Sequence, residues 1–157
     1  MKKYFATILI LAPVIFSSCS SDGKSETVKN TSSEAIDGLN QKETQYYSNG
    51  KRLYAMYCNS CHMENGQGLG RLIPPLSKSD YIVANRAILP RILKYGLNGP
   101  IMVNGVEFNQ PMPANPKLTD LEIAEILTYV GNTWGNKMDS FTLEEVNQSR
   151  SNSGEEN

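Results

Sequence analysis

The sequence is short of the residues on which several kinds of protein depend. It has one histidine, His62, and three cysteines, Cys19, Cys58 and Cys61. Cys58, Cys61 and His62, which lie together in the sequence, would give a zinc site only three nitrogen or sulfur ligands, so a carboxylate would have to be recruited as the fourth. A peroxidase that uses a distal histidine as acid–base catalyst would lack that group. The net charge of -1 and the absence of long runs of one charge argue against nucleic-acid binding.

The chain also lacks an apolar run long enough to cross a membrane as a helix. The run at residues 4–16 is shorter than the roughly 20 residues that the core of a bilayer requires. Lys2 and Lys3 precede this run, and small residues lead from it into Cys19, a pattern typical of a signal peptide. The junction resembles the lipobox of bacterial lipoproteins. We therefore expect residues 1–18 to be a lipoprotein signal peptide and Cys19 to carry the lipid; the alternative is an ordinary secretory signal.

The composition divides the remaining chain into three parts. Residues 19–42 are rich in Ser, Thr, Asn, Lys and Glu and have almost no apolar periodicity, which predicts a lipid-anchored disordered linker. Residues 43–138 carry helical patterns and are expected to form the folded domain. Residues 139–157 hold one short amphipathic piece and then become polar and acidic, so we expect a frayed tail there.

Residues 58–62 read C-x-x-C-H, the pattern that attaches haem covalently to a protein. The two thiols would add to the haem vinyl groups, and His62 would give a ring nitrogen to the iron. On a helix Cys58, Cys61 and His62 share one face, so one turn could present all three groups to one porphyrin. A thioredoxin-type motif would need a βαβ context, which this part of the sequence does not show.

The hydrophobic periodicity predicts a mainly helical domain with one short hairpin. A first helix is expected over residues 45–61 and a second over residues 85–95, ending at Gly96, with Pro90 delaying its regular part. Thr119 and Glu122 form a capping box that starts a third helix, which should run to Gly135. Asn104-Gly105 lies between apolar residues and predicts a tight turn within residues 101–108. The glycines and prolines of residues 66–76 exclude regular structure and favour a loop against the haem edge.

A second iron ligand must come from another residue type, because the chain has no second histidine. Methionine is the leading candidate. Met112 is favoured because prolines flank it and limit the entropy lost when the segment becomes ordered. Met102, in the expected hairpin, and an iron site left open remain the alternatives.

The motifs together resemble those of class I cytochromes c with one haem, over about residues 45–136. The resemblance rests on Gly50, Tyr54, Cys58, Cys61, His62, Pro74, Pro75, Leu76, Met112, Pro113, Leu118, Thr119 and Asp120. It implies an all-α fold of three main helices around one haem c, with a short β-hairpin in a loop. It also implies that His62 is the proximal iron ligand, that Met112 is the distal one, and that the Pro74 carbonyl, or that of Pro75, accepts a hydrogen bond from His62.

The function expected from this resemblance is electron transfer rather than catalysis. The protein would be a monomer on a lipid anchor at Cys19, in the bacterial cell envelope with its domain in the periplasm or at the cell exterior. It would exchange single electrons with redox protein partners and bind no nucleic acid. The alternatives are a fixed haem subunit of a larger oxidoreductase or respiratory complex, and a haem sensor or peroxidase with a vacant iron site.

Overall fold

The computed structural model describes residues 39–151 of the 157-residue chain. Its contacts divide the chain into residues 1–31 and residues 32–157, and all the described residues belong to the second unit. The expected signal peptide, Cys19 and most of the expected linker lie outside the described residues. None of the helices in the described part combines the length and the apolar character that crossing a bilayer requires.

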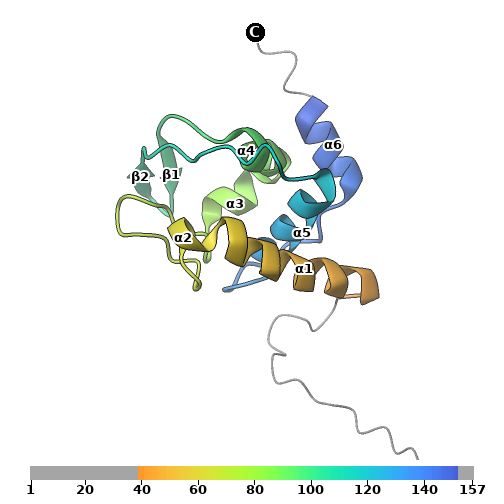
Figure 1. Ribbon diagram of the computed structural model, residues 1–157. Coiled ribbons are helices and arrows are strands. Elements are labelled where there is room, and N and C mark those ends of the chain that lie inside the picture. The colour runs from red at the N-terminus through yellow and green to blue at the C-terminus, as the bar shows by residue number, and fades with distance from the viewer. Residues whose placement is uncertain (1–38, 152–157) are drawn as a thin grey trace, which may run out of the picture. The chain divides into compact units, whose positions relative to one another are not determined.

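The described residues form a mostly helical fold with one small hairpin (Figure 1). The helices are α1 (Gln41–Tyr57), α2 (Asn59–His62), α3 (Asp80–Ala84), the 3-10 helix η1 (Arg86–Ile88), α4 (Leu89–Tyr95), α5 (Asp120–Gly131) and α6 (Leu143–Ser151). The strands β1 (Ile101–Val103) and β2 (Val106–Phe108) pair antiparallel. The predicted fold class is confirmed: α1, α4 and α5 correspond to the three predicted helices, and α6, which is longer than α4, adds a further one.

Helix α1 begins earlier than the sequence analysis predicts and ends before the haem-attachment motif is complete. The Asn40 side chain accepts the backbone N–H of Glu43 at 3.1 Å, and the Glu43 carboxylate accepts that of Asn40 at 2.8 Å, so a capping box starts the helix. At its other end α1 stops at Tyr57, so the single helix predicted over residues 45–61 is divided, and Cys58 lies between α1 and the short α2.

Helices α1 and α5 make the most extensive contact between two elements (Figure 1). They approach so closely because Gly50 has no side chain: a Cβ there would collide with the Glu125 carbonyl and lie 2.8 Å from Tyr129 Cβ. Tyr54 packs beside the crossing, with ring centroids 5.4 Å from Tyr129 and 5.1 Å from Trp134. The contacts within this aromatic cluster add to the apolar packing at the crossing.

Helix α5 starts as predicted and ends sooner. The Thr119 side chain accepts the Glu122 N–H at 3.3 Å, and the Glu122 carboxylate accepts the Thr119 N–H at 2.8 Å. The helix ends at Gly131, since the C-cap Asn132 leaves the helical conformation with φ -123° and ψ 18°. Trp134 and Gly135 then adopt positive φ angles of 54° and 88° and turn the chain further. Trp134 thereby folds back onto the aromatic cluster instead of extending the helix.

The segment between the haem-attachment motif and α5 combines two confirmed predictions and one helix that the sequence analysis missed. Pro90 lies in the first turn of α4, where a proline is tolerated, and Gly96 follows the helix with a φ of 82°. Asn104 and Gly105 form the hairpin turn, both with positive φ. The missed helix is α3, whose N-cap Ser79 accepts the Ile82 N–H.

The prediction of a frayed tail is wrong for residues 139–151. Phe141 is 2% exposed and Val146 is fully buried, so the segment carrying α6 belongs to the hydrophobic core. The Phe141 N–H donates to the Thr128 hydroxyl at 3.0 Å, which ties the segment to α5. Phe141 and Val146 pack into a core whose other residues come from earlier in the chain, and this packing holds the polar helix α6 on the domain.

Candidate functional site

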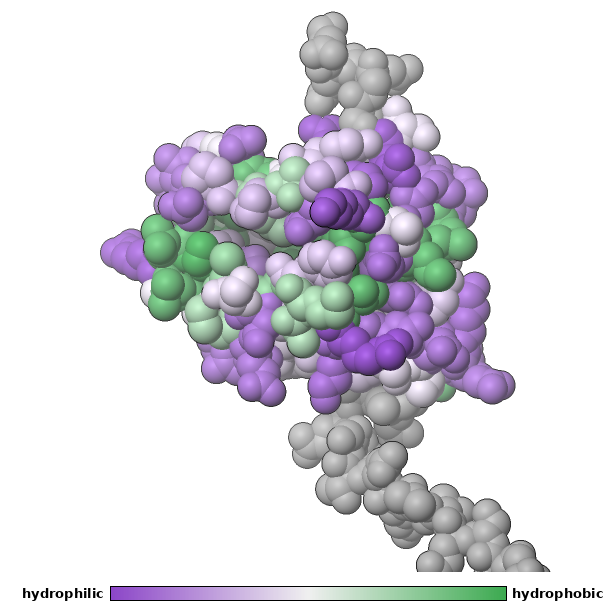
Figure 2. Space-filling model, viewed as in Figure 1, coloured by the Kyte–Doolittle hydropathy of each residue, from purple (hydrophilic) through white to green (hydrophobic). Residues whose placement is uncertain are grey.

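A cavity of about 340 Å³ lies beside the haem-attachment motif. Its wall is largely aliphatic, and the two helices that supply much of it contribute Leu89, Ile92 and Leu93 from α4 and Ile126, Leu127 and Val130 from α5. Figure 2 shows apolar residues gathered around a hollow on the face in view. The volume is within the range of small-molecule and cofactor sites, which are mostly apolar with a few well-placed polar groups.

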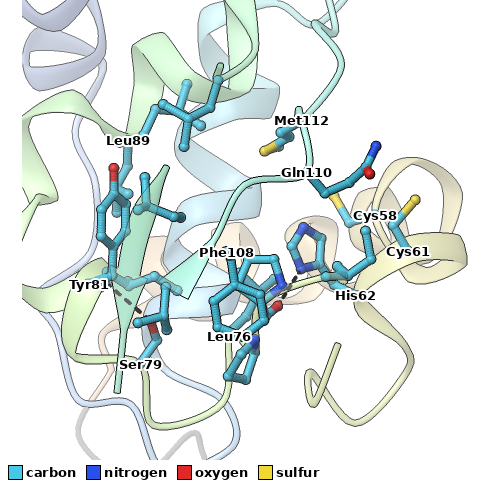
Figure 3. Close-up of a pocket in the computed structure, with 18 of the residues that line it drawn as sticks. Cys58, Cys61, His62, Leu76, Ser79, Tyr81, Leu89, Phe108, Gln110 and Met112 are labelled. Atoms are coloured by element: carbon cyan, nitrogen blue, oxygen red, sulfur yellow. Dashed lines mark hydrogen bonds between the residues drawn. The ribbon is translucent and has the colours of Figure 1, made fainter. Parts of the chain in front are cut away.

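His62 is the polar group that enters this cavity from α2 (Figure 3). Its ring is buried, with 8% of the residue exposed, and its Nδ1 lies 3.1 Å from the Pro74 carbonyl oxygen. A carbonyl can only accept, so Nδ1 carries the proton and Nε2 keeps a free lone pair. Burial lowers the pKa of His62, and the hydrogen bond to Pro74 opposes this change. The ring is therefore held as a neutral imidazole, the form that ligates metals.

The segment that accepts this hydrogen bond is itself fixed by the turn after His62. Met63 has a positive φ of 62°, and its carbonyl accepts the Tyr54 hydroxyl at 2.6 Å and the Gly66 N–H at 3.1 Å. The Gly66 carbonyl in turn accepts the N–H groups of Leu76 at 2.7 Å and Ser77 at 2.9 Å. These hydrogen bonds connect Tyr54 on α1, through Met63 and Gly66, to Leu76, two residues after Pro74.

The glycine-rich loop lies behind this segment rather than in the cavity wall. A Cβ on Gly66 would lie 2.5 Å from the Trp134 ring, and one on Gly68 would collide with the Ile73 carbonyl. The residues from this part of the chain that line the cavity are Leu72, Ile73, Pro74, Pro75 and Leu76. The loop supports the wall, and the residues after it form the wall.

Cys58 and Cys61 both line the cavity, and both are free thiols. Cys58 is half-buried, and burial, followed by the nearby Cys61, raises its pKa to about 12. Cys61 is exposed. The break between α1 and α2 at Cys58 does not separate the three predicted groups, since Cys58, Cys61 and His62 all border the same cavity.

Met112 is the one methionine of the described part of the chain that lines the cavity. Its N–H donates to the Leu97 carbonyl at 2.9 Å, and its carbonyl accepts the Leu97 N–H at 3.0 Å. Met102, on β1, is 55% exposed and does not line the cavity. Figure 3 shows the Met112 thioether and the His62 ring entering the cavity from different sides.

These groups fit a haem held through two thioethers. The two thiols border the cavity, a neutral imidazole and a thioether enter it from two sides, and the wall around them is apolar. Within residues 39–151 no three His, Cys, Asp or Glu side chains are gathered in a way that could hold a metal ion directly.

Several wall residues were not identified by the sequence analysis. Leu127 and Val130, on α5, belong to the hydrophobic core and also line the cavity. Leu89, Ile92 and Leu93 were not singled out, although their i, i+3, i+4 spacing marks one face of α4. Gln110, Tyr81 and Ser79, which supply polar atoms, carried no local signal.

The comparisons with known proteins agree on one family. Residues 47–134 match the model of the family described as Cytochrome c. The chain is 35% identical over 112 residues to a protein named cytochrome c-552 from Thermus thermophilus, which covers 66% of this chain and 85% of the relative. It is also 28% identical over 89 residues to the cytochrome c subunit of a quinone alcohol dehydrogenase from Gluconobacter oxydans, covering 55% of this chain and 18% of that subunit.

Proposed function

The chain belongs to the cytochrome c family, and from this premise we propose that it is a membrane-tethered carrier of single electrons with His/Met iron ligation. Family membership establishes haem-based electron transfer and a haem c bound covalently through Cys58 and Cys61. The haem supplies an iron that cycles between the ferrous and ferric states. The residues of the chain determine how that iron is held and which molecules reach it.

His62 is the proximal ligand in this proposal. Its Nδ1–H is committed to the Pro74 carbonyl, so Nε2 is the nitrogen available to the iron. This hydrogen bond fixes the orientation of the ring and raises its basicity as a ligand. The buried position of His62 limits the access of water to the bond.

Met112 is the distal ligand, and the observation that carries this assignment is its place in the cavity wall. Met56 is 71% exposed and Met102 is 55% exposed, and neither lines the cavity. With both axial positions filled, no substrate could bind at the iron. A thioether in place of a second imidazole raises the reduction potential.

The lipid anchor at Cys19 and the location in the bacterial cell envelope rest on the sequence pattern alone. Replacing Cys19 with Ala should move the protein from the membrane fraction to the soluble periplasmic or culture fraction. If the variant remains in the membrane fraction to the same extent as the wild type, the chain is not anchored through Cys19.

A fixed haem subunit of a larger oxidoreductase is the second candidate. It is supported by the similarity to cytochrome c subunits of quinone alcohol dehydrogenases from Gluconobacter oxydans and Gluconacetobacter polyoxogenes. Purification from native membranes separates the two candidates. A free carrier should run as a monomer, whereas a subunit should co-purify with its complex at constant stoichiometry.

The ligand assignment is tested by reduced-minus-oxidised spectra of the wild type, Met112→Leu and Met102→Leu, each with and without carbon monoxide. The wild type and Met102→Leu should bind carbon monoxide poorly, and Met112→Leu should bind it readily. If the wild type itself binds carbon monoxide readily, the distal position is open. If Met102→Leu alone opens the site, Met102 is the ligand.

A further inference from the structure

Helix α6 lies beyond the part of the chain that matches the cytochrome c family model. The match ends at residue 134, whereas α6 spans Leu143–Ser151. The helix contacts α4, α5 and η1 (Figure 1). Val146 and the preceding Phe141 belong to the core. This segment therefore lies outside the matched residues and touches both helices that supply much of the cavity wall.

One side chain ties this addition to the start of α4. Arg86, in η1, donates from Nε to Glu145 Oε1 at 2.9 Å and from Nη2 to Glu145 Oε2 at 3.2 Å. The same guanidinium donates to the carbonyls of Asp139 at 2.8 Å and Ser140 at 3.1 Å. It also lies 3.9 Å from the centroid of the Phe141 ring. We call these contacts of Arg86 the clamp.

Helix α4, which follows the clamp directly, carries the segment that contains Met112. The Leu93 carbonyl accepts the Asn115 N–H at 3.2 Å, and Lys94 Nζ donates to the Pro116 carbonyl at 2.9 Å. Leu97 then pairs with both backbone groups of Met112. Met112 is thus held by Leu97, two residues beyond the end of α4, and the residues that follow Met112 are held by α4 itself.

We propose that the clamp is a positioning device for the distal ligand, in which Arg86 holds α4 against α6 and thereby keeps Met112 on the iron. The inference rests on the proposed His/Met ligation. Without the clamp, α4 and the Met112 segment shift together and the distal position opens while the α1–α5 crossing stays folded. Arg86 is a positioning residue in this scheme, since it lies outside the cavity wall.

The proposal predicts a change in ligand affinity and not only in stability. An external ligand binds only the open state, so its apparent affinity scales with the fraction of protein in that state. Removing the hydrogen bonds of a charged group shifts such an equilibrium by about tenfold or more. A clamp that stabilised the whole fold equally would leave this fraction unchanged.

The test is the binding of imidazole to the ferric holoprotein in wild type, Arg86→Met and Glu145→Gln. Arg86→Met keeps an apolar stem over Phe141 and removes the donors. We expect its imidazole affinity to rise about tenfold and the far-red band of the ferric methionine–iron bond to weaken. Glu145→Gln keeps one side-chain oxygen that can accept from the Thr142 N–H and hydroxyl. It should show a smaller change in the same direction, and it covers the case in which Arg86→Met fails to fold.

The matched control is Asn40→Ala, which removes the cap of α1 on another part of the domain. It should lower stability and leave the imidazole affinity within about twofold of the wild type. Equal imidazole affinity in wild type, Arg86→Met and Glu145→Gln would show that the clamp serves the fold alone. An equal rise in Asn40→Ala would show that any loss of stability opens the site, and would overturn the proposal.

Met112→Leu separates a failure of this inference from a failure of the proposed ligation. If Met112→Leu binds imidazole no more tightly than the wild type, Met112 is not the ligand. If Met112→Leu binds tightly while Arg86→Met matches the wild type, the ligation holds and the clamp proposal is wrong. In the double variant, Arg86→Met should add nothing to Met112→Leu, because no Met112–iron bond remains to be positioned.

Discussion

His62 and Met112 enter the same cavity, but the chain holds them by different means. On the His62 side, the support is dense packing: the α1–α5 crossing, the ring of Trp134 against Gly66, and a hydrogen bond from Tyr54 to the turn after His62. On the Met112 side, the support is a backbone pair with Leu97 in a segment whose neighbouring residues are largely exposed. Packing therefore fixes the position of His62, and a few backbone hydrogen bonds fix the position of Met112.

Because the supports differ, we expect the His62 side and the Met112 side of the cavity to lose their structure independently of each other. Tightly interdigitated groups move only when the core opens, whereas a segment held by a few hydrogen bonds can open locally. A change at the helix crossing should therefore unfold the domain. A change near Met112 should release one ligand and leave the domain folded.

The largest effect is expected for Gly50→Ala, which changes the close α1–α5 crossing on the His62 side. The new Cβ would collide with the Glu125 backbone carbonyl, and backbone atoms at a helix crossing have no alternative rotamer. We expect a loss of about 3 kcal/mol in the free energy of unfolding, measured by urea denaturation of the holoprotein. Gly131→Ala is the control, because its Cβ would lie 3.2 Å from Met138 Cβ, a tight contact but not a collision with a backbone carbonyl, and should cost less. Equal stability of Gly50→Ala and wild type would contradict the close approach of the helices.

Gly96→Ala changes the backbone beside Met112 and should displace this proposed ligand. Gly96 has a φ of 82° and a ψ of -177°, a region restricted to glycine, and a Cβ would lie 2.5 Å from the Met112 carbonyl oxygen. We expect a cost of about 2 kcal/mol and loss of the far-red methionine–iron band, with the helical circular dichroism retained. Gly105→Ala is the control: Gly105 has a φ of 76°, an added Cβ would meet no atom within 4 Å, and the residue does not line the cavity, so this variant should show strain and keep the band. Loss of the band in both variants would mean that strain alone, and not the collision, displaces Met112.

Tyr54→Phe removes one hydrogen bond from the packed side without changing the shape of the core. The Met63 carbonyl keeps its second donor, the Gly66 N–H, so we expect a cost of about 1 kcal/mol. The ferric far-red band should be unchanged, because the distal side is untouched. A loss of that band would show that the two sides are coupled more strongly than their separate supports indicate.

The smallest effect is expected for Glu122→Gln, at the start of α5. Hydrogen bonds from the Thr119 N–H and hydroxyl hold the pKa of Glu122 below its ordinary value, and Lys94 adds a smaller effect. A lowered folded-state pKa gives stability that is present above the unfolded pKa and is lost as the pH falls through the folded value. The variant should therefore show a shallower loss of stability in acid, measured by thermal unfolding between neutral pH and about pH 3. An unchanged acid slope would contradict this.

The sequence predicted those parts of the site that depend on local patterns. The C-x-x-C-H motif identified Cys58 and His62 as neighbours of one site, and Asn104-Gly105 and the Thr119 capping box located the hairpin and α5. Met112 lines the cavity and Met102 does not, while the ligation of the iron by Met112 stays a prediction.

The parts that were missed depend on partners far away in the sequence. Residues 139–151 were predicted to be a tail because their composition is mostly polar. The hydrogen bonds from Arg86 to the Ser140 carbonyl and from the Phe141 N–H to Thr128 join them to distant parts of the chain, and a local sequence pattern does not reveal such bonds. The end of α5 was placed too late because Trp134 has helical spacing, and the aromatic cluster that draws it away from the helix includes Tyr54 on α1.

The pair of hydrogen bonds between Leu97 and Met112 also separates two timescales of ligand exchange. The backbone of Met112 is fixed at both its N–H and its carbonyl. If Met112 ligates the iron as proposed, its thioether would leave by rotation about its own side-chain bonds, a motion of picoseconds to nanoseconds, whereas opening of the backbone pair belongs to the slower class of loop and local-unfolding motions. A displaced Met112 side chain would then stay beside the cavity and could return many times before the segment itself moved away.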